Sequence, residues 1–247
     1  MSSKRRYFGF SLIEVLLAVA TLAIGMIFVG GTFLVGIYLS GVSAERTTAV
    51  IVANEAFSKV RIFGVNLAMC AVDSQAPFET VAGSVDPNEF AYPSTRTLAQ
   101  KQYFWSALCR RDPNDPNNAL QVTVFVCRKI GSGARYRDPS DPFDPMKWID
   151  RPVVLPVVVS FVRVDSAGPV LAIEAGKERW ISPGYTIVED STGAIYRVVG
   201  NGVRPDEINL DPAKPWPWAV AKVWVVPPAI GHGKGPCIEV YQGEVRF

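Results

Sequence analysis

The chain has 247 residues, of which 49% are hydrophobic and 19% charged, and its formal net charge is +2. Charges this close to balance and scattered along the chain argue against a nucleic-acid-binding surface. A single histidine and the lack of a CxxC pair argue against an ordinary zinc site. The length suffices for a membrane helix and one further core of ordinary domain size.

The first feature in chain order is a long apolar run behind a basic leader. Lys4, Arg5 and Arg6 precede the run, and no charged residue interrupts the stretch from Val15 to Leu39. A membrane-spanning helix needs roughly 20 apolar residues, so this stretch predicts one. By the positive-inside rule, the leader faces the cytoplasm and the rest of the chain lies outside.

Glu14 lies at the entry to this run. An ionised carboxylate in a membrane span costs on the order of 2.5 kcal/mol or more unless a partner compensates it. Either Glu14 lies close enough to the interface to reach headgroups and water, or a cation pairs with it. Thr21 and Thr32 pose no such problem, because a threonine hydroxyl can bond to a carbonyl one turn earlier in its own helix.

The residues around Glu14 resemble the amino-terminal motif of type IV pilins and type II secretion pseudopilins. The resemblance covers the basic leader, Gly9, Phe10 and Glu14 at fixed spacing, and the apolar run. In that family a prepilin peptidase cuts after the glycine and N-methylates the next residue, which implies cleavage between Gly9 and Phe10. It also implies that Glu14 neutralises the new amino terminus of a neighbouring subunit during assembly. Within the family, the run is most similar to PilV-type minor pilins.

The middle of the run departs from many major pilins, which carry a proline there. This chain has Gly30 and Gly31 instead. Glycine costs a helix about 1 kcal/mol relative to alanine, so the pair could mark a point where the helix loosens in a fibre. The pair could equally allow close packing of neighbouring helices on small residues. Both interpretations remain open.

A second helical pattern follows and is predicted to continue the same helix to Gly64, a typical helix stop. Its apolar stripe, expected to pack on the rest of the protein, consists of Val50, Ala53, Phe57 and Val60. Glu55 and Lys59 are expected to form an ion pair on another, solvated face. We therefore expect a leader at residues 1–9 and a long helix at 10–64. Residues 10–42 of the helix would cross the membrane or form a fibre core, and residues 43–64 would be amphipathic.

Residues 65–247 are predicted to form a mainly β head, so the fold class is α+β, with a long amino-terminal helix packed on antiparallel strands. A connection with a short helix is expected up to about residue 100. Strands are expected at 102–110, 120–129, 153–164, 170–175, 186–189, 195–199, 203–204, 220–226 and 238–247.

The first two strands are expected to form a hairpin in which Cys109 lies opposite Gln121 or Val122, not Cys127. Pro156 predicts an edge position or a bulge, and residues 190–193 predict a hairpin turn. We expect two antiparallel groups, both leaning on the helix.

Four cysteines lie in the part of the chain that is expected outside the cytoplasm. They are Cys70, Cys109, Cys127 and Cys237. An even number in an oxidising compartment permits one or two disulfides, with three full pairings. The sequence does not choose among these pairings.

The head shows no arrangement of residues typical of catalysis, so no enzyme activity and no cofactor are expected. Asp138, Asp141 and Asp144 are the candidates for a calcium site, but their spacing lacks the pattern of a calcium-binding loop. His232 lies in a glycine-rich stretch without phosphate-loop spacing, which reads as a flexible loop. Trp216, Trp218 and Trp224 are expected to cover the sheet or its seam with the helix rather than to form an exposed adhesive patch.

Together these features predict a non-enzymatic structural subunit, favouring a minor one, of a type IV pilus or type II secretion pseudopilus. It would cross the inner membrane once, with the leader cytoplasmic and the head extracytoplasmic, and then enter a fibre. The implied partners are other pilin or pseudopilin subunits, prepilin peptidase, the inner-membrane assembly platform and membrane lipid. The alternative is a membrane-tethered extracytoplasmic enzyme or binding protein that uses residues 1–42 as an uncleaved signal anchor.

Overall fold

The computed structural model describes residues 11–93, 101–115, 119–131, 133–144 and 146–246. Its first element is one long helix, α1 (Leu12–Phe63). The helix stops as predicted, because Gly64 adopts a φ of 72° and its N–H bonds to the carbonyl of Val60 at 3.1 Å. Glycine adopts this left-handed conformation without steric cost. The chain divides into two compact units, Met1–Arg46 and Thr47–Phe247, and the second unit contains the last turns of α1 and the head.

The second half of α1 packs on the head through a stripe of small apolar side chains. The buried members of this stripe are Ala49, Val52, Ala53, Ala56 and Val60. Phe57 packs at the margin of the same cluster. The predicted stripe is wrong at Val50, which is 45% exposed. The helix is rotated so that alanines face the head, which brings its backbone close to the sheet.

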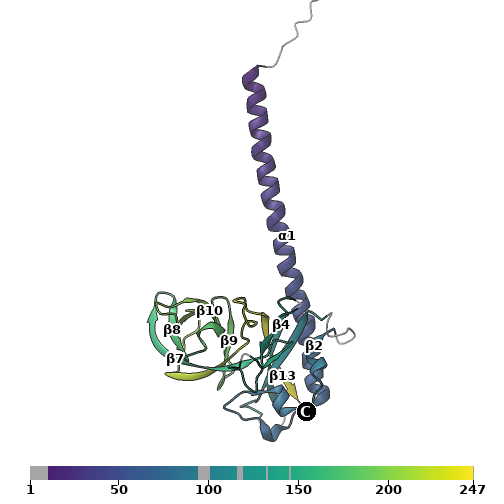
Figure 1. Cartoon of the computed structure of the whole chain (residues 1–247), viewed down its shortest axis with the longest axis vertical. Helices are drawn as coiled ribbons and strands as arrows, with labels where there is room; N and C mark the ends of the chain where they lie inside the picture. The colour runs from purple at the N-terminus through teal and green to yellow at the C-terminus, as the bar shows by residue number, and fades with distance from the viewer. Residues whose placement is uncertain (1–10, 94–100, 116–118, 132, 145, 247) are drawn as a thin grey trace, which may run out of the picture. The chain divides into compact units, whose positions relative to one another are not determined.

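An antiparallel sheet lies against this half of the helix (Figure 1). Its strands are β1 (Ala76–Pro77), β2 (Ala91–Tyr92), β3 (Tyr103–Arg111), β4 (Ala119–Arg128) and β13 (Cys237–Arg246). The main path is β1-β3-β4-β13, and β2 pairs with β3. The predicted hairpin forms between β3 and β4, with Cys109 opposite Val122 and Cys127 opposite Phe104. The prediction that Cys109 and Cys127 do not face each other is therefore confirmed.

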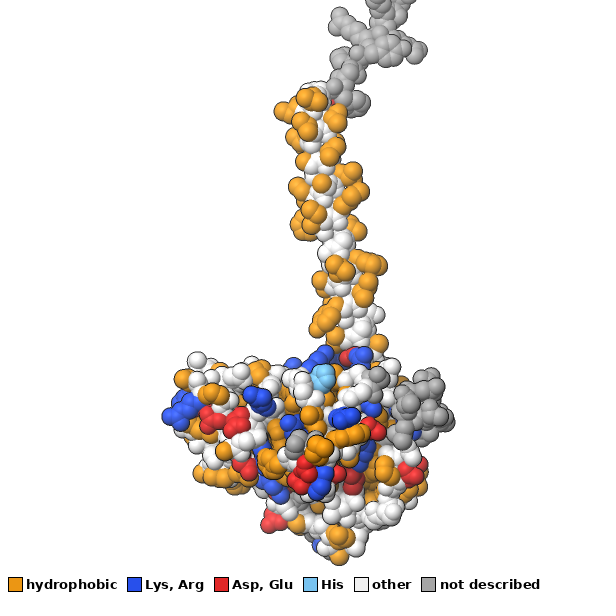
Figure 2. Space-filling view, viewed as in Figure 1, with side chains coloured by type: hydrophobic (Ala, Val, Ile, Leu, Met, Phe, Trp, Pro, Cys, Tyr) orange, Lys and Arg blue, Asp and Glu red, His pale blue; other side chains and the backbone are white. Residues whose placement is uncertain are grey.

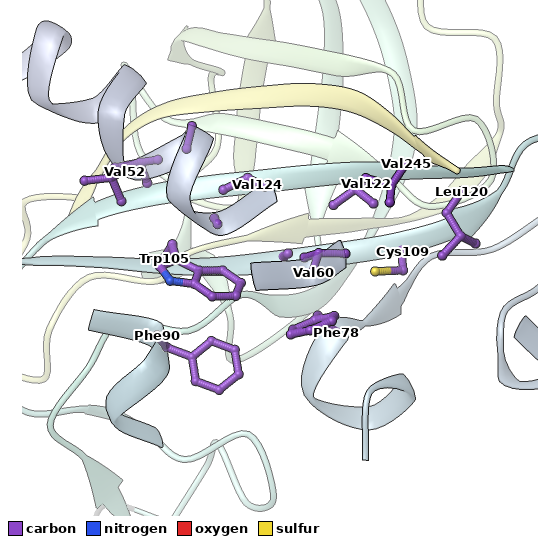
Figure 3. Close-up of a cluster of buried hydrophobic side chains, with 14 of the residues drawn as sticks. Val52, Val60, Phe78, Phe90, Trp105, Cys109, Leu120, Val122, Val124 and Val245 are labelled. Carbon is purple, nitrogen blue, oxygen red and sulfur yellow. The ribbon is translucent and has the colours of Figure 1, made fainter. Parts of the chain in front are cut away.

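Short helical segments connect α1 to the sheet and complete the core. They are η1 (Leu67–Met69), α2 (Phe78–Val81) and η2 (Pro87–Phe90). Phe78 and Phe90 contact Trp105 of β3 at ring-centroid distances of 5.8 and 4.8 Å. Figure 3 shows these three side chains gathered with Val52 and Val60 of α1. The expected connection with a short helix thus carries aromatic residues of the main core.

The carbonyl of Glu89 joins the helix to the sheet. Lys59 Nζ on α1 donates to it at 2.7 Å, and Trp105 Nε1 on β3 donates to it at 3.0 Å. The predicted ion pair of Lys59 with Glu55 is present at 2.8 Å, and the Glu89 carboxylate adds a second at 3.0 Å. The expectation of a solvated face is wrong, because Lys59 is only 8% exposed. A buried ammonium needs such partners, since an unpaired charge in the interior is costly.

Between β4 and β13 the chain forms a closed barrel (Figure 1). Its strands are β7 (Leu155–Asp165), β8 (Gly168–Ile173), β9 (Thr186–Glu189), β10 (Ile195–Asn201), β11 (Glu207–Leu210) and β12 (Val220–Val225). They follow the order β10-β11-β8-β7-β12-β9, and η4 (Glu178–Trp180) adds Trp180 to the interior. Among the described residues, none from α1 belongs to the barrel core. The expectation that both groups of strands pack against the helix is therefore wrong, because only the sheet packs against it.

The loop before the barrel contains a two-stranded pair, β5 (Tyr136–Arg137) and β6 (Trp148–Ile149). After β10, residues 203 and 204 were expected to be extended, but they lie in a turn. The N–H of Gly202 bonds to the carbonyl of Glu207 at 2.8 Å, so the partner strand begins only at Glu207. The turn is longer than the two residues that Asn201 and Gly202 suggested.

Pro156 was predicted to lie at an edge or a bulge, and it lies at a local edge: β7 is paired on both sides farther along, but only on the β12 side at Pro156. The strand pairs with β12 on one side and β8 on the other, and its irregularity lies between Phe161 and Arg163. The pairing with β8 begins only at Val159. Pro156 therefore has one strand neighbour, at Trp224 of β12, and its missing N–H interrupts no ladder on the β8 side.

The turn between β9 and β10, predicted from residues 190–193, attaches the barrel to the sheet. Asp190 Oδ1 accepts from Trp224 Nε1 at 2.6 Å and from the Gln75 N–H at 3.1 Å, and Oδ2 lies 2.9 Å from Lys222 Nζ. Arg110 of β3 donates to the carbonyl of Ser191. An apolar cluster that includes Leu108, Phe125, Val188 and Trp224 fills the rest of the seam.

Two of the three tryptophans weighed above are buried, but neither lies at the seam of sheet and helix: Trp216 belongs to the barrel core and Trp224 to the cluster between sheet and barrel. Trp216 and Trp224 are 7% and 5% exposed, and Trp216 packs edge-to-face on Tyr196 at 5.0 Å. Trp218 is 39% exposed. The seam that Trp224 covers lies between sheet and barrel, not between sheet and helix.

Glu189 predicts a pH dependence of head stability. Burial opposes its charged form, but hydrogen bonds from Thr192 and Ser191 outweigh burial and lower the pKa of Glu189 below its usual 4.5. A lowered folded-state pKa stabilises the fold fully above the unfolded value, and this contribution is lost as the pH falls through the folded value. We expect Glu189→Gln to lower the melting temperature by several degrees near pH 7, and the difference to shrink towards pH 3.

Differential scanning calorimetry of the full chain in detergent measures this difference. Glu244, whose side chain is 43% exposed, provides the control, since Glu244→Gln is expected to change the melting temperature by less than about 1 °C at either pH. A difference for Glu189→Gln that stays constant from pH 7 to pH 3 would contradict the assignment to its carboxylate.

Candidate functional site

The amino-terminal half of α1 exposes apolar side chains along the face seen in Figure 2, and its other large apolar residues are exposed as well. Its large apolar residues from Leu12 to Leu39 are between 51% and 79% exposed. An 18-residue window reaches a mean hydropathy of 2.6, and none of it is buried. A helix that is apolar on every side needs lipid or other helices around it. By length and composition, α1 is able to cross a membrane.

The two threonine hydroxyls in this stretch find partners within the helix, as predicted. Thr21 Oγ1 donates to the carbonyl of Leu17 at 3.0 Å, and Thr32 Oγ1 donates to the carbonyl of Phe28 at 3.0 Å. Each bond spans one turn of α1. Neither threonine therefore requires a polar partner from outside the helix.

Glu14 lies in the first turn of α1, where its side chain is exposed. Its N–H bonds to the carbonyl of Ser11 at 3.0 Å, so the residue is held in the helix from its first turn. Its side chain borders a shallow, almost entirely apolar groove formed with Val15, Ala18, Val19 and Leu22. Apolar residues therefore border Glu14 on this side of the helix.

No described basic residue of the first unit lies near Glu14. The nearest described basic residue along the helix is Arg46. At 1.5 Å per residue the two positions are about 48 Å apart along the helix axis. Any charge that neutralises Glu14 in a membrane must therefore come from solvent, from a headgroup, from the undescribed leader or from another molecule. Gly9 and Phe10, the predicted processing residues, lie outside the described part of the chain.

Small residues follow one face of the same helix and line two further shallow grooves. The first is bordered by Ala18, Thr21, Leu22, Gly25, Met26, Val29 and Gly30, and the second by Val29, Thr32, Phe33, Gly36, Ile37 and Ser40. A Cβ added at Gly25 or Gly36 would meet no atom within 4 Å. These positions recur at eleven-residue spacing, a period close to three helical turns. That spacing is visible in the sequence, but the prediction considered only the Gly30–Gly31 pair.

Gly30 and Gly31 lie inside the continuous helix, so α1 shows no break at the pair. A Cβ at either position would also meet no atom within 4 Å. Small residues let helix backbones approach closely in a membrane. The grooves thus provide a surface on which a second helix could pack.

The cysteines lie on two faces of the sheet, and all four thiols are free in the structure. Cys70 and Cys109 belong to the cluster between sheet and helix, whereas Cys127 and Cys237 belong to the cluster between sheet and barrel. Burial raises the pKa of the Cys70, Cys109 and Cys127 thiols. These thiols are therefore poor nucleophiles at neutral pH.

The aspartates weighed as calcium ligands serve as turn residues. Asp138 accepts hydrogen bonds from Ser140, Asp144 accepts from the Met146 N–H at 2.8 Å, and Asp141 pairs with Lys147 at 3.1 Å. The hydrogen bonds from Ser140 lower the pKa of Asp138. In the described ranges, no group of three or more His, Cys, Asp and Glu side chains is placed to hold a metal ion.

The loop of His232 is held from the barrel side. The N–H of His232 bonds to the carbonyl of Ala229 at 2.9 Å, and Tyr185 Oη donates to the carbonyl of Gly233 at 3.3 Å. Burial raises the pKa of Tyr185 to about 12, so its hydroxyl remains a donor at neutral pH. These bonds give the loop a defined path over the barrel.

Comparison with family models, curated proteins and solved structures finds no match to this chain. The pilin resemblance of the first residues is therefore supported by those residues alone. What the structure adds is a helix with apolar side chains exposed around it, grooves of small residues along it, and one carboxylate without a described partner.

Proposed function

We propose that this chain is a structural subunit of a type IV pilus or a type II secretion pseudopilus. The observation that carries the proposal is the apolar helix with Glu14 exposed in its first turn. Before assembly the apolar surface would be covered by lipid, and in a fibre it would be covered by the same helix of other subunits. The change of surroundings costs little, because both environments are apolar.

The proposed assembly step pairs Glu14 of one subunit with the amino group of Phe10 of its neighbour. Prepilin peptidase would create that amino group by cutting after Gly9 and would then methylate it, and the amine stays cationic on methylation. In an apolar fibre core, opposite charges attract more strongly than in water. The pairing would also fix the axial offset between adjacent helices, since each carries a single carboxylate in this stretch.

The head would lie outside the cytoplasm, and the inner-membrane assembly platform would move the subunit from lipid into the fibre. We favour a minor subunit, because a sheet with an inserted barrel is a large head to repeat along a fibre. An apolar cluster fills the seam between barrel and sheet, and both belong to one compact unit.

Mass spectrometry of the amino-terminal peptide tests the proposal. We expect protein purified from its native membranes to begin at N-methylated Phe10. Protein from cells that lack the peptidase provides the control and should retain the leader. An intact leader in cells with an active peptidase contradicts the proposal and favours the alternative, a tethered extracytoplasmic enzyme or binding protein that uses residues 1–42 as an anchor.

A further inference from the structure

Cys127 and Cys237 face each other across neighbouring strands of the sheet. They are register partners in the antiparallel pair of β4 and β13. The N–H of Arg128 donates to the carbonyl of Pro236 at 2.8 Å. A bond between the residue after one partner and the residue before the other identifies the cysteines as a non-hydrogen-bonded pair. In such pairs the Cα atoms are about 4.5 Å apart, which lies within the range of disulfides.

The two thiols also share one environment. Both cysteines belong to the apolar cluster between sheet and barrel, with Leu108, Phe125 and Val226. Cys127 is fully buried and Cys237 is partly exposed. Burial raises the pKa of the Cys127 thiol, and the neighbouring Cys237 thiol adds to the effect. The Cys237 thiol itself donates to the carbonyl of Glu239 at 3.7 Å.

The alternation of side chains along the strands excludes the other pairings of Cys127. Cys109 of β3 and Cys70 lie in the cluster on the helix face of the sheet, and Cys127 lies in the cluster on the barrel face. Successive side chains of a strand point to opposite faces, so the backbone of the sheet separates the two sets. If a second bond forms, it joins Cys70 to Cys109.

We propose that Cys127 and Cys237 form a disulfide. The bond would join the end of β4, where the chain leaves the sheet for the barrel, to the start of β13, where the chain returns to the sheet. The bond would close a loop that holds β5 to β12 and every strand of the barrel. The barrel would then remain tied to the sheet even when the seam opens. The presence of an oxidant rests on the proposed function, which places the head outside the cytoplasm.

The oxidation is a thiol–disulfide exchange with a protein or small-molecule disulfide as oxidant. The thiolate of the partly exposed Cys237 attacks the oxidant, forms a mixed disulfide and releases one oxidant thiolate. The Cys127 thiolate then attacks the Cys237 sulfur and releases the second. The two cysteines lose two protons and two electrons, and the oxidant disulfide is reduced to two thiols. Because the Cys127 thiol is buried in the finished fold, the second step is fastest before the seam closes.

Peptide mapping of the full chain from native membranes tests the bond. Free thiols are first alkylated in acid, and the protein is then digested with trypsin without reduction. Each cysteine falls in its own tryptic peptide, residues 62–96, 102–110, 112–128 or 235–246. We expect peptide 112–128 linked to peptide 235–246, and release of both on reduction. Alkylated Cys127 and Cys237 as the main forms, or a link from 112–128 to either of the other peptides, overturns the proposal.

Two cysteine variants test the assignment of the linked peptides. Cys109→Ser should leave the link between 112–128 and 235–246 intact, because residue 109 lies on the opposite face of the sheet. Cys237→Ser should abolish the link and leave Cys127 unlinked. A loss of the link in Cys109→Ser would contradict the assignment of faces.

The same digest also yields the amino-terminal peptide, so the fibre function and the disulfide are tested independently. An intact leader together with the linked peptides overturns the fibre function and leaves the disulfide standing. A methylated Phe10 together with free Cys127 overturns the disulfide and leaves the fibre function standing.

Discussion

Glu14→Val is expected to insert and to be processed like the wild type, but to enter fibres at least about tenfold less efficiently. Valine keeps the surface of α1 apolar and the helix intact, so the substitution removes only the charge. An unpaired charge in a membrane span costs on the order of 2.5 kcal/mol, and the pairing that relieves this cost would favour the fibre. Each 1.4 kcal/mol is about a factor of ten in an equilibrium. The measurement is the ratio of subunit in sheared fibres to subunit in membranes.

Thr21→Val supplies the matched control on the same helix. The Thr21 hydroxyl already bonds to the carbonyl of Leu17, so its loss leaves no partner unpaired in a fibre. Thr21→Val should assemble normally, and Glu14→Asp should fall between the wild type and Glu14→Val. Wild-type incorporation of Glu14→Val would contradict the charge-pairing step. Equal defects in Thr21→Val and Glu14→Val would indicate a general sensitivity of the helix instead.

The local features of the fold could be predicted because their causes lie close together in the sequence. Length and hydropathy determine α1, Gly64 stops it, and turn formers determine the hairpin of β3 and β4. The sequence pattern wrongly placed Val50 in the buried stripe of the helix. Hydropathy favours the larger apolar residue, whereas close packing on the sheet selects Ala49 and Ala56.

The barrel could not be predicted because its closure depends on strands far apart in the chain. β12 pairs with β7 and β9, and β13 returns to β4 across the whole insertion. Nothing near Val220 specifies these partners. The ion-pair prediction for Lys59 failed in part for the same reason, since Glu89 reaches it from a connection whose path the helix pattern does not determine.

The candidate site was predictable to different degrees. The leader motif made Glu14 a candidate from the sequence alone, and the structure shows which apolar side chains border it. The cysteine pairing needed the register, because only the partnership of β4 with β13 places Cys127 beside Cys237. The partner of Glu14 belongs to another molecule in the proposed function, so a single chain cannot display it.

Trp105→Ala is expected to destabilise the head by about 3–5 kcal/mol, the usual cost of removing a large aromatic side chain from a core. The side chain is 1% exposed and lies between Phe78 and Phe90. Its removal would leave a cavity that these rings cannot fill without breaking their contacts with α1. Its indole N–H also bonds to the Glu89 carbonyl, which Lys59 of α1 shares. The variant therefore weakens the attachment of the helix to the sheet as well as the core.

Differential scanning calorimetry of the full chain in detergent measures the effect, with Trp218→Ala as the matched control. For a domain of this size each kcal/mol shifts the melting temperature by roughly 2–4 °C, so Trp105→Ala should melt about 10 °C lower. Trp218 is 39% exposed, and its replacement should shift the melting temperature by about 2 °C or less. Equal shifts for the two variants would contradict the core described between α1, η2 and β3. A large shift for Trp105→Ala with normal processing at Phe10 would show that the head can be weakened without affecting the membrane segment, as expected of two separate units.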